Sequence, residues 1–348
     1  MMLIRPICTG DIDSLLRLAS HAGVGLTTLP ASRELLAKHV ADSEYAFGSQ
    51  VQAPGGERYL LVMEDPLTGQ IVGCAGVVGR VGGFDPFYSY VLKTVVKESE
   101  SINVVKVIKT LNLVQDHKGP SEIGTLFVHP EYRRGGHGRL MSLARFLFMA
   151  ASPGRFTEHV IAEMRGNVGD ETGSHFWRAV GKHFFDMDFV DADKRSAGNK
   201  QFIADLMPRH PIYVSMLPGE AQAVIGEVHP EARPALKLLK DEGFEFGDEV
   251  DIFDAGPLYR AKTADIRTIR DSQTAVLSNV LPREPESAQH LISNDRLDFR
   301  ATLGAVQVNE DGTVSLARAT VLTLGARLGD TVRYVAARPA TGNEASSR

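Results

Sequence analysis

Cysteine is scarce in this chain, since Cys8 and Cys74 are its 2 cysteines among 348 residues. Two thiols cannot build a disulfide framework or a cysteine-rich metal cluster, so we expect no resident metal. Long apolar runs are also lacking. The most apolar stretch, residues 140–151, contains Arg145 and is too short to span a bilayer. Residues 1–6 lack the long apolar run of a signal peptide, so we expect a cytoplasmic protein with no membrane partner.

An excess of positive charge is absent too. The formal net charge is −5 and the isoelectric point is near 6.1. The basic residues are dispersed except in one loop, which argues against a nucleic-acid partner. Hydrophobic residues make up 43% of the chain, enough for a sizeable core. The length allows two domains, or one large domain with an appendage.

The most informative pattern lies in residues 123–149. An apolar strand is followed by a short turn, by Arg-x-x-Gly-x-Gly at residues 133–138, and by a mostly apolar helix. The first N–H groups of a helix have no partner within it, and the helix dipole adds partial positive charge there. Glycine lets a pyrophosphate approach the backbone closely. The predicted phosphate-binding residues are Arg133, Arg134, Gly135, Gly136, His137, Gly138 and Arg139.

The surrounding sequence indicates which cofactor this loop binds. A P-loop would end in Gly-Lys-Ser/Thr, and a dinucleotide-binding loop would read Gly-x-Gly-x-x-Gly; neither is present. Arg/Gln-x-x-Gly-x-Gly/Ala between a strand and a helix resembles the coenzyme A pyrophosphate loop of the GCN5-related N-acetyltransferase superfamily. The resemblance implies an acyl-CoA co-substrate.

The order of predicted elements agrees with this resemblance. Strands are predicted at residues 3–5, 59–64, 71–78, 123–128 and 159–164, and helices after Asp11, after the loop at 133–138 and from Ser174. We therefore expect an α/β (α+β) fold, a GCN5-related N-acetyltransferase-like mixed sheet flanked by helices. The resemblance implies that its central strands splay apart around the acyl arm. The aromatic residues at 176–177 and 184–185 have helical spacing and are predicted to lie in the core.

The chain continues well beyond a minimal acyltransferase. We predict a strand at 201–207, helices at 221–226 and 234–242, a short strand ending in a turn at 251–257, and a polar linker at 281–290. Alternating apolar residues after the linker predict a small β-rich appendage with a hairpin turn at 309–312, then a disordered tail from Pro339. The expected division is an acyltransferase core at 1–200, a substrate-lobe extension at 201–280, and linker with appendage at 281–348.

One tetrapeptide occurs twice. Val-His-Pro-Glu stands at residues 128–131 and again at 228–231. Proline suits the first turn of a helix and glutamate suits its dipole, so two similar helix starts need no common ancestry. We interpret the recurrence as coincidence.

Six motifs together resemble the bacterial arginine N-succinyltransferase family. They lie at residues 25–30, 162–166, 176–189, 204–213, 226–230 and 251–257. The resemblance extends over roughly residues 1–275, whereas residues 80–115 and the C-terminal appendage are only loosely similar. It implies that succinyl-CoA and L-arginine give CoA and N2-succinyl-L-arginine, with L-ornithine as an acceptor in some members. It also implies a homo-oligomer, or a hetero-oligomer with a related subunit.

The chemistry needs a base, because the α-amino group of free arginine is mostly protonated. A positioned base contributes about 10²–10⁴ in rate, and histidine is the commonest choice. The resemblance implies that His229 is this residue, with His210 as the runner-up. It also implies that the main chain of Leu126 binds the thioester oxygen and that Leu126 and Val128 contact the pantetheine arm. No nucleophile is evident, so we expect direct attack in a ternary complex.

The two charged ends of the substrates need partners. The guanidinium requires a carboxylate, for which Glu163, Asp251 and Asp254 are the candidates. Arg165 is the candidate for the succinyl carboxylate. Three other interpretations stay open: an acetyl-CoA-dependent acyltransferase of another small amine, one subunit of a two-chain enzyme, and an arginine-binding regulatory module.

Overall fold

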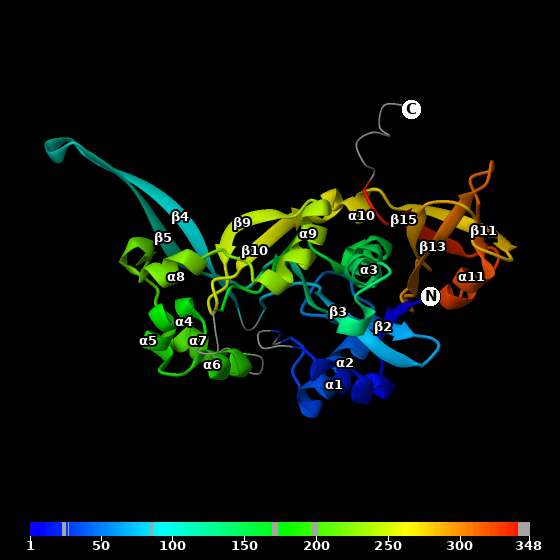
Figure 1. Cartoon of the computed structure of the whole chain (residues 1–348), viewed down its shortest axis with the longest axis horizontal. Helices are drawn as coiled ribbons and strands as arrows, with labels where there is room; N and C mark the ends of the chain where they lie inside the picture. The colour runs from blue at the N-terminus through cyan, green and yellow to red at the C-terminus, as the bar shows by residue number, and fades with distance from the viewer. Residues whose placement is uncertain (23–25, 27, 84–85, 169–172, 197–200, 340–348) are drawn as a thin grey trace.

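The computed structural model describes residues 1–348 except 23–25, 27, 84–85, 169–172, 197–200 and 340–348. A central mixed sheet carries helices on both faces. A helical lobe adjoins one end of this sheet, and a small β-rich unit adjoins the other (Figure 1). The fold is therefore mixed α/β with a β-rich C-terminal unit, as the sequence predicts.

The central sheet has the strand order β1-β2-β3-β6-β7-β10-β9. Its strands are β1 (Leu3–Pro6), β2 (Arg58–Asp65), β3 (Gln70–Val78), β6 (Ser121–Val128), β7 (His159–Glu163), β9 (Glu245–Val250) and β10 (Pro257–Lys262). Only β6 and β7 run parallel within this set. Most residues of β2, β3 and β7 are buried, as expected where both faces of a sheet are covered.

Helices cover this sheet on both sides (Figure 1). Helices α1 (Ile12–Ala19) and α2 (Arg33–Gly48) pack against β2 and β3. On the other face, α3 (His137–Ala151) packs on β3 and β6 and contacts α9 (Arg233–Asp241) and α10 (Arg267–Arg270). All ten residues from 140 to 149 of α3 are buried, so this helix is the centre of the main core.

The parallel strands β6 and β7 separate soon after they meet. They pair at Ser121–Val160 and Glu122–Ile161 and not beyond. On the opposite edge of β6, the register with β3 shifts at Thr125, whose φ is +54°. This combination is a β-bulge, which bends a strand away from regular pairing. The splay that the superfamily resemblance implies is therefore present.

The helical lobe has its own core. It contains α4 (His175–Ala179), α5 (Lys182–Phe185), α6 (Phe189–Ser196), α7 (Gln201–Leu206), β8 (Ile212–Tyr213) and α8 (Gly219–Val224). Trp177 lies at its centre, and its indole N–H donates to the Met187 carbonyl at 3.0 Å. Of the predicted aromatic core residues, Phe184 is 41% exposed and the other three are buried.

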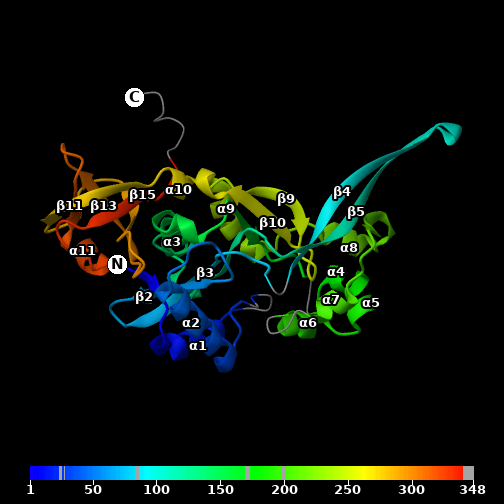
Figure 2. The ribbon, with the colours of Figure 1, turned by 180° about the vertical axis from the view of Figure 1, so that it is seen from behind.

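Two long strands join this lobe to the sheet. β4 (Phe87–Ser99) and β5 (Val104–Asp116) form one antiparallel hairpin. Near its base, β4 pairs with β9 and β5 pairs with β8. The distal part of the hairpin projects away from the rest of the molecule (Figures 1 and 2).

The C-terminal unit is a closed five-stranded barrel. Its strands are β11 (Gln273–Leu281), β12 (Gln289–Ser293), β13 (Ala301–Val308), β14 (Val314–Ala317) and β15 (Thr331–Ala336), and α11 (Arg318–Leu324) packs beside them. The order β12-β15-β11-β14-β13 is closed by an additional β12–β13 pairing. Because each of these five described strands has two neighbours, the small β unit has no edge to protect, which favours its stability.

The structure corrects three expectations. The expected strand at 201–207 is wrong, because Gln201–Leu206 forms helix α7, whose Ile203 and neighbouring apolar side chains pack into the helical lobe. Residues 251–257 form the turn between β9 and β10, stabilised by aspartate side chains. The expected linker at 281–290 contains the end of β11 and the start of β12.

Other regions were not predicted or cannot be compared. The sequence patterns led to no expectation for α2 or for the long β4–β5 hairpin. The expected disordered tail lies outside the described residues from residue 340 on, as do parts of the motif at 25–30. Among the residues that the structure describes, no helix has the length and apolar character needed to cross a membrane.

Candidate functional site

The glycine-rich loop leads directly into α3. Gly135 and Gly136 both have positive φ, at +60° and +80°, a conformation that favours glycine. Gly136 is the N-cap of α3, so the next backbone N–H groups begin the helix without intrahelical acceptors. A Cβ atom built on Gly138 would meet nothing within 4 Å. The His137 N–H donates to the Arg134 carbonyl at 3.1 Å, so the donors left for a pyrophosphate are those of the next residues in the first turn.

The three arginines of this loop have different roles. Arg134 is exposed. Arg133 is also exposed, although its Nε donates to the Val128 carbonyl at 2.9 Å. Arg139 turns away, pairing with Asp241 at 3.5 Å and donating to the Ala337 carbonyl at 3.3 Å. Arg133 and Arg134 are thus the cations available to an anion, whereas Arg139 links α3 to the C-terminal unit.

His137 and Gly136 connect the loop to its surroundings. The His137 ring contacts the Tyr132 carbonyl at 3.0 Å, which fixes the turn before the helix. A Cβ on Gly136 would lie 3.3 Å from Leu303 of β13. The barrel therefore rests against the loop itself.

Leu126 lies on the splayed part of β6. It follows the bulge at Thr125 and is half-buried against the main core. Because β7 no longer pairs with β6 at this level, the Leu126 main chain lies in the gap between the strands. Val128 lies two residues further, pairs with Gly73, and has its carbonyl engaged by Arg133.

Arg145 supports the strand that carries Leu126, and sequence reasoning missed this role. Its guanidinium donates to Gly124 at 3.3 Å and to both the carbonyl and the hydroxyl of Ser142. It is 2% exposed, and burial lowers its pKa to about 9. The available signal was a single charge inside an apolar helix, since such a residue is rarely buried without a specific acceptor.

His229 is attached to the end of β7. Its backbone N–H donates to the Arg165 carbonyl at 2.9 Å, and the preceding Val228 forms a β-bridge with Gly166. The His229 side chain caps the following turn, because the Glu231 N–H donates to its Nδ1 at 3.3 Å. In the neutral ring this contact places the proton on Nε2. The imidazole is half-buried.

The surroundings of His229 favour its neutral form. Partial burial lowers the pKa of His229, the Arg165 charge lowers it further, and Glu231 opposes them. Arg165 reaches Glu231 at 3.5 Å, while its Nε is buried without a partner. A buried donor with no acceptor is costly, so the guanidinium is suited to receive an anion.

The repeated tetrapeptide has one conformation in both places. His129 and His229 have nearly identical φ and ψ angles, −53° and 135° against −52° and 136°, and each precedes a short 3₁₀ turn that starts with proline. Their surroundings differ. The His129 ring packs on His21 at 4.7 Å and its Nδ1 is buried without a partner.

Asp251 and Asp254 form a carboxyl pair in the β9–β10 turn. Asp251 accepts the N–H groups of Phe253 and Asp254, and Asp254 accepts those of Gly256 and Gly166, each at 2.7 to 2.9 Å. The two side chains also hydrogen-bond each other. Burial raises the pKa of both groups, and the nearby Asp251 helps to raise that of Asp254 to about 8. The pair joins this turn to the segment that holds His229.

The remaining candidates lie apart from these contacts. Glu163 is exposed at the end of β7, two residues before Arg165. His210 is exposed after α7, just before β8. The structure thus brings His229, Arg165 and Asp254 together, with Glu163 two residues before Arg165 at the end of β7.

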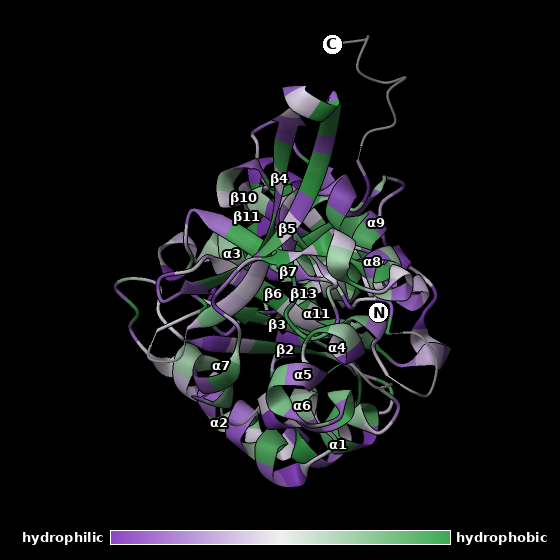
Figure 3. Ribbon diagram, turned by 90° about the vertical axis from the view of Figure 1, so that its left-hand side faces the viewer, coloured by the Kyte–Doolittle hydropathy of each residue, from purple (hydrophilic) through white to green (hydrophobic). Residues whose placement is uncertain are grey.

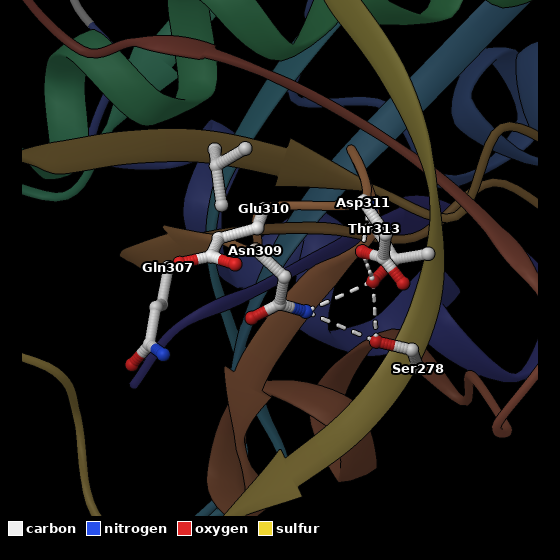
Figure 4. A pocket seen from close by; sticks show the side chains of 7 residues that line it. Ser278, Gln307, Asn309, Glu310, Asp311 and Thr313 are labelled. Atoms are coloured by element: carbon white, nitrogen blue, oxygen red, sulfur yellow. Dashed lines mark hydrogen bonds between the residues drawn. The ribbon is translucent and has the colours of Figure 1, made fainter.

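Two pockets of the described structure lie away from these candidate residues. One, of about 550 Å³, surrounds the β13–β14 turn, where Asn309, Ser278 and Thr313 hydrogen-bond one another (Figure 4). The other, of about 310 Å³, lies between α4 and α8 and includes His175 and Glu220. Neither includes His229 or the glycine-rich loop. Among the described residues, no group of three or more His, Cys, Asp or Glu side chains could hold a metal ion.

Two family descriptions match this chain. The one described as "Arginine N-succinyltransferase beta subunit" matches residues 2–268. The other describes the C-terminal domain of the same beta subunit and matches residues 273–336. The boundary between them falls just before β11, where the barrel begins.

Similar proteins cover nearly the whole chain. An arginine N-succinyltransferase of Yersinia enterocolitica is 40% identical over 338 residues, which is 96% of this chain and 97% of that protein. One from Enterobacter sp. (strain 638) is 42% identical over 339 residues, with the same shares. A solved structure, arginine/ornithine succinyltransferase subunit AI from Pseudomonas aeruginosa, has a TM-score of 0.88 at 35% identity and covers 97% of this chain and 99% of its own.

Proposed function

Because the chain belongs to the arginine N-succinyltransferase family, we propose that it transfers a succinyl group from succinyl-CoA to the α-amino group of L-arginine. The match along almost the whole length is the observation that carries this proposal. It is supported by the loop at the start of α3, where exposed Arg133 and Arg134 lie next to the backbone N–H groups of the first helical turn. These groups would hold the pyrophosphate of the acyl donor.

We assign proton transfer to His229. The charge of Arg165 and partial burial favour its neutral form, which a base requires. The contact with the Glu231 N–H puts its proton on Nε2. To accept the substrate proton at Nε2, the ring must first change tautomer, so that its own proton lies on Nδ1 and the contact with the Glu231 N–H is broken. The α-amino nitrogen then attacks the thioester carbon and a C–N bond forms. When the C–S bond breaks, the CoA sulfur leaves with the electron pair and takes up a proton.

The main chain of Leu126 would stabilise the thioester oxygen as it becomes negative. A preorganised N–H at this point is worth most where water is excluded. The splay between β6 and β7 supports this assignment, because it leaves the Leu126 main chain without a strand partner on that side. Val128 would contribute to the pantetheine site next to it. Direct transfer in a ternary complex needs no acyl-enzyme.

The charged ends of the substrates would lie near His229. Arg165, with its buried unpaired Nε, is suited to the succinyl carboxylate. For the guanidinium, Glu163 is favoured because it is exposed, whereas Asp251 and Asp254 are half-buried in the turn whose backbone they hold. Ornithine is a second acceptor to test, because the Pseudomonas aeruginosa subunit is named for both amino acids.

The proposal also covers the location of the enzyme, its assembly and the alternative acyl donor. A cytoplasmic location is supported by two free cysteines, Cys8 and Cys74, since reducing compartments keep thiols unpaired. An oligomer is supported by the word "subunit" in the family description and in the name of the similar structure. The acetyl-CoA-dependent enzyme remains the alternative.

Release of free CoA thiol tests the reaction. Succinyl-CoA and acetyl-CoA are each offered with L-arginine, with L-ornithine or with no acceptor. Arginine-dependent release from succinyl-CoA alone is the expected result. Release from acetyl-CoA alone would overturn the donor, and CoA binding without any release would indicate a missing subunit.

A further inference from the structure

The β4–β5 hairpin extends far beyond its last support. The pairing with β9 ends at Val91 and the pairing with β8 begins at Thr110. Between them, residues 92–109 form a free arm whose strands pair only with each other. Eight residues from 92 to 99 span about 26 Å. Figures 1 and 2 show the arm pointing into solvent.

One face of the arm exposes more apolar surface than the other. Val96, Val105 and Val107 share this face and are 64%, 62% and 66% exposed. The same face continues towards the body through Leu92 and Leu111, which belong to the core of the helical lobe. Figure 3 shows hydrophobic positions alternating with polar ones along these strands. An isolated two-stranded hairpin is only marginally stable in water, so a long arm of this kind is expected to be covered.

The opposite face exposes less apolar surface and carries more charge. Val95 is 43% exposed there, and Val104 and Ile108 are half-buried. Lys97 and Lys106 are directly opposed in the register, with Lys93 on the same side. Like charges facing each other across a ribbon destabilise it unless water screens them. This face is therefore suited to solvent, and the valine face is the one to be covered.

The charges on the valine face are arranged symmetrically about its centre. Val96 and Val107 are opposite each other. Glu98 lies two residues towards the tip, and Lys109 lies two residues towards the base, both exposed. If two arms pack antiparallel with their valine faces together, Glu98 of each arm lies at the same height along the contact as Lys109 of the other arm. The contact therefore contains two such pairs of opposite charge. Parallel arms would instead bring like charges together.

We propose that the valine face of the arm packs against the same face of the arm of a second copy of this chain, antiparallel about a two-fold axis. Such an isologous contact needs a self-complementary patch. The apolar centre with opposite charges on its two sides meets that condition. The proposal concerns assembly and does not depend on which acyl donor or amine the enzyme uses.

Sedimentation equilibrium of the full chain tests the apolar part. The double variant Val96→Lys, Val107→Lys is expected to weaken self-association by at least about tenfold. The control is Leu67→Lys, which changes an apolar residue that is 91% exposed in the β2–β3 turn and is expected to leave association unchanged. Circular dichroism and CoA binding, expected to match the wild type, report folding of every variant.

A charge exchange tests the antiparallel two-fold arrangement. Glu98→Lys alone and Lys109→Glu alone should each weaken self-association, because each puts like charges at both contacts. An equimolar mixture of the two single variants should associate like the wild type, since every contact then joins opposite charges. A monomeric wild type, an unchanged valine variant, or a mixture no tighter than its components would each overturn the proposal.

Discussion

The carboxyl pair in the β9–β10 turn makes the stability of this protein fall with rising pH. The pKa of Asp254 is about 8 in the folded chain, against 3.8 for the group in its ordinary state. Between those values the folded chain holds a proton that the unfolded chain has released, so raising the pH favours unfolding. Below about pH 4 the effect is fully stabilising, and above about pH 8 it is lost.

The magnitude follows from the shift. About four pKa units at roughly 1.4 kcal/mol each set a ceiling of about 6 kcal/mol. Because the pair is half-buried and solvent screens it, we expect about 2 to 3 kcal/mol to be lost from the free energy of unfolding between about pH 5 and pH 8. Urea titrations at several pH values in this window measure that loss.

The variant Asp251→Asn should reduce this pH dependence, because it removes the Asp251 charge and leaves the burial of Asp254, which is the larger cause of its raised pKa. Its amide oxygen can still accept the Phe253 and Asp254 N–H groups, and its NH₂ can donate to Asp254, so the turn is kept without a second charge. The free energy of unfolding of Asp251→Asn should fall less steeply with pH than that of the wild type. Asp205→Asn, at an exposed position of α7, is the control for the same chemical change. Parallel curves for the wild type and Asp251→Asn would refute the reasoning.

Three other substitutions test the site. His229→Ala should lower kcat by about 10²-fold or more with CoA affinity nearly unchanged. The control His129→Ala, at the same local backbone conformation, should mainly lower thermal stability. Equal losses of kcat in the two variants would remove the role of His229. Gly138→Asp should abolish CoA binding in calorimetry by adding negative charge at the helix start, and unaltered binding would contradict the loop assignment. Arg145→Met removes the side chain that donates to the Gly124 carbonyl, so we expect a loss of about 1 to 3 kcal/mol in the free energy of unfolding. We also expect kcat to fall by more than the CoA affinity changes. An unchanged kcat would show that Arg145 does not position β6.

Local sequence patterns predicted the centre of this fold well and its additions less well. The strand, loop and helix at 121–151 were predictable because glycine, proline and apolar periodicity all favour one arrangement there. Residues 201–207 were misread as a strand because a short apolar run has no distinctive period, and packing in the helical lobe decides its conformation. Residues 251–257 form a turn and not a strand because the side chains of Asp251 and Asp254 compete for backbone N–H groups.

Within the site, sequence could place the loop but not the contacts between distant segments. Nothing in residues 163–166 or 228–231 alone shows that the His229 N–H donates to the Arg165 carbonyl. Likewise, the role of the buried Arg145 depends on Gly124, 21 residues earlier. Such pairings depend on tertiary structure, which periodicity does not encode.

The position of the barrel against the glycine-rich loop has a thermodynamic consequence. Leu303 lies beside Gly136, and Arg139 reaches the carbonyl of Ala337, so the barrel is in contact with both the loop and the helix that follows it. Ligand binding in the loop and docking of the barrel beside it are then thermodynamically coupled, and each must favour the other by the same free energy. Succinyl-CoA should therefore slow proteolysis at the junction near residue 272, and loosening that junction should weaken the binding of succinyl-CoA by an equal free energy.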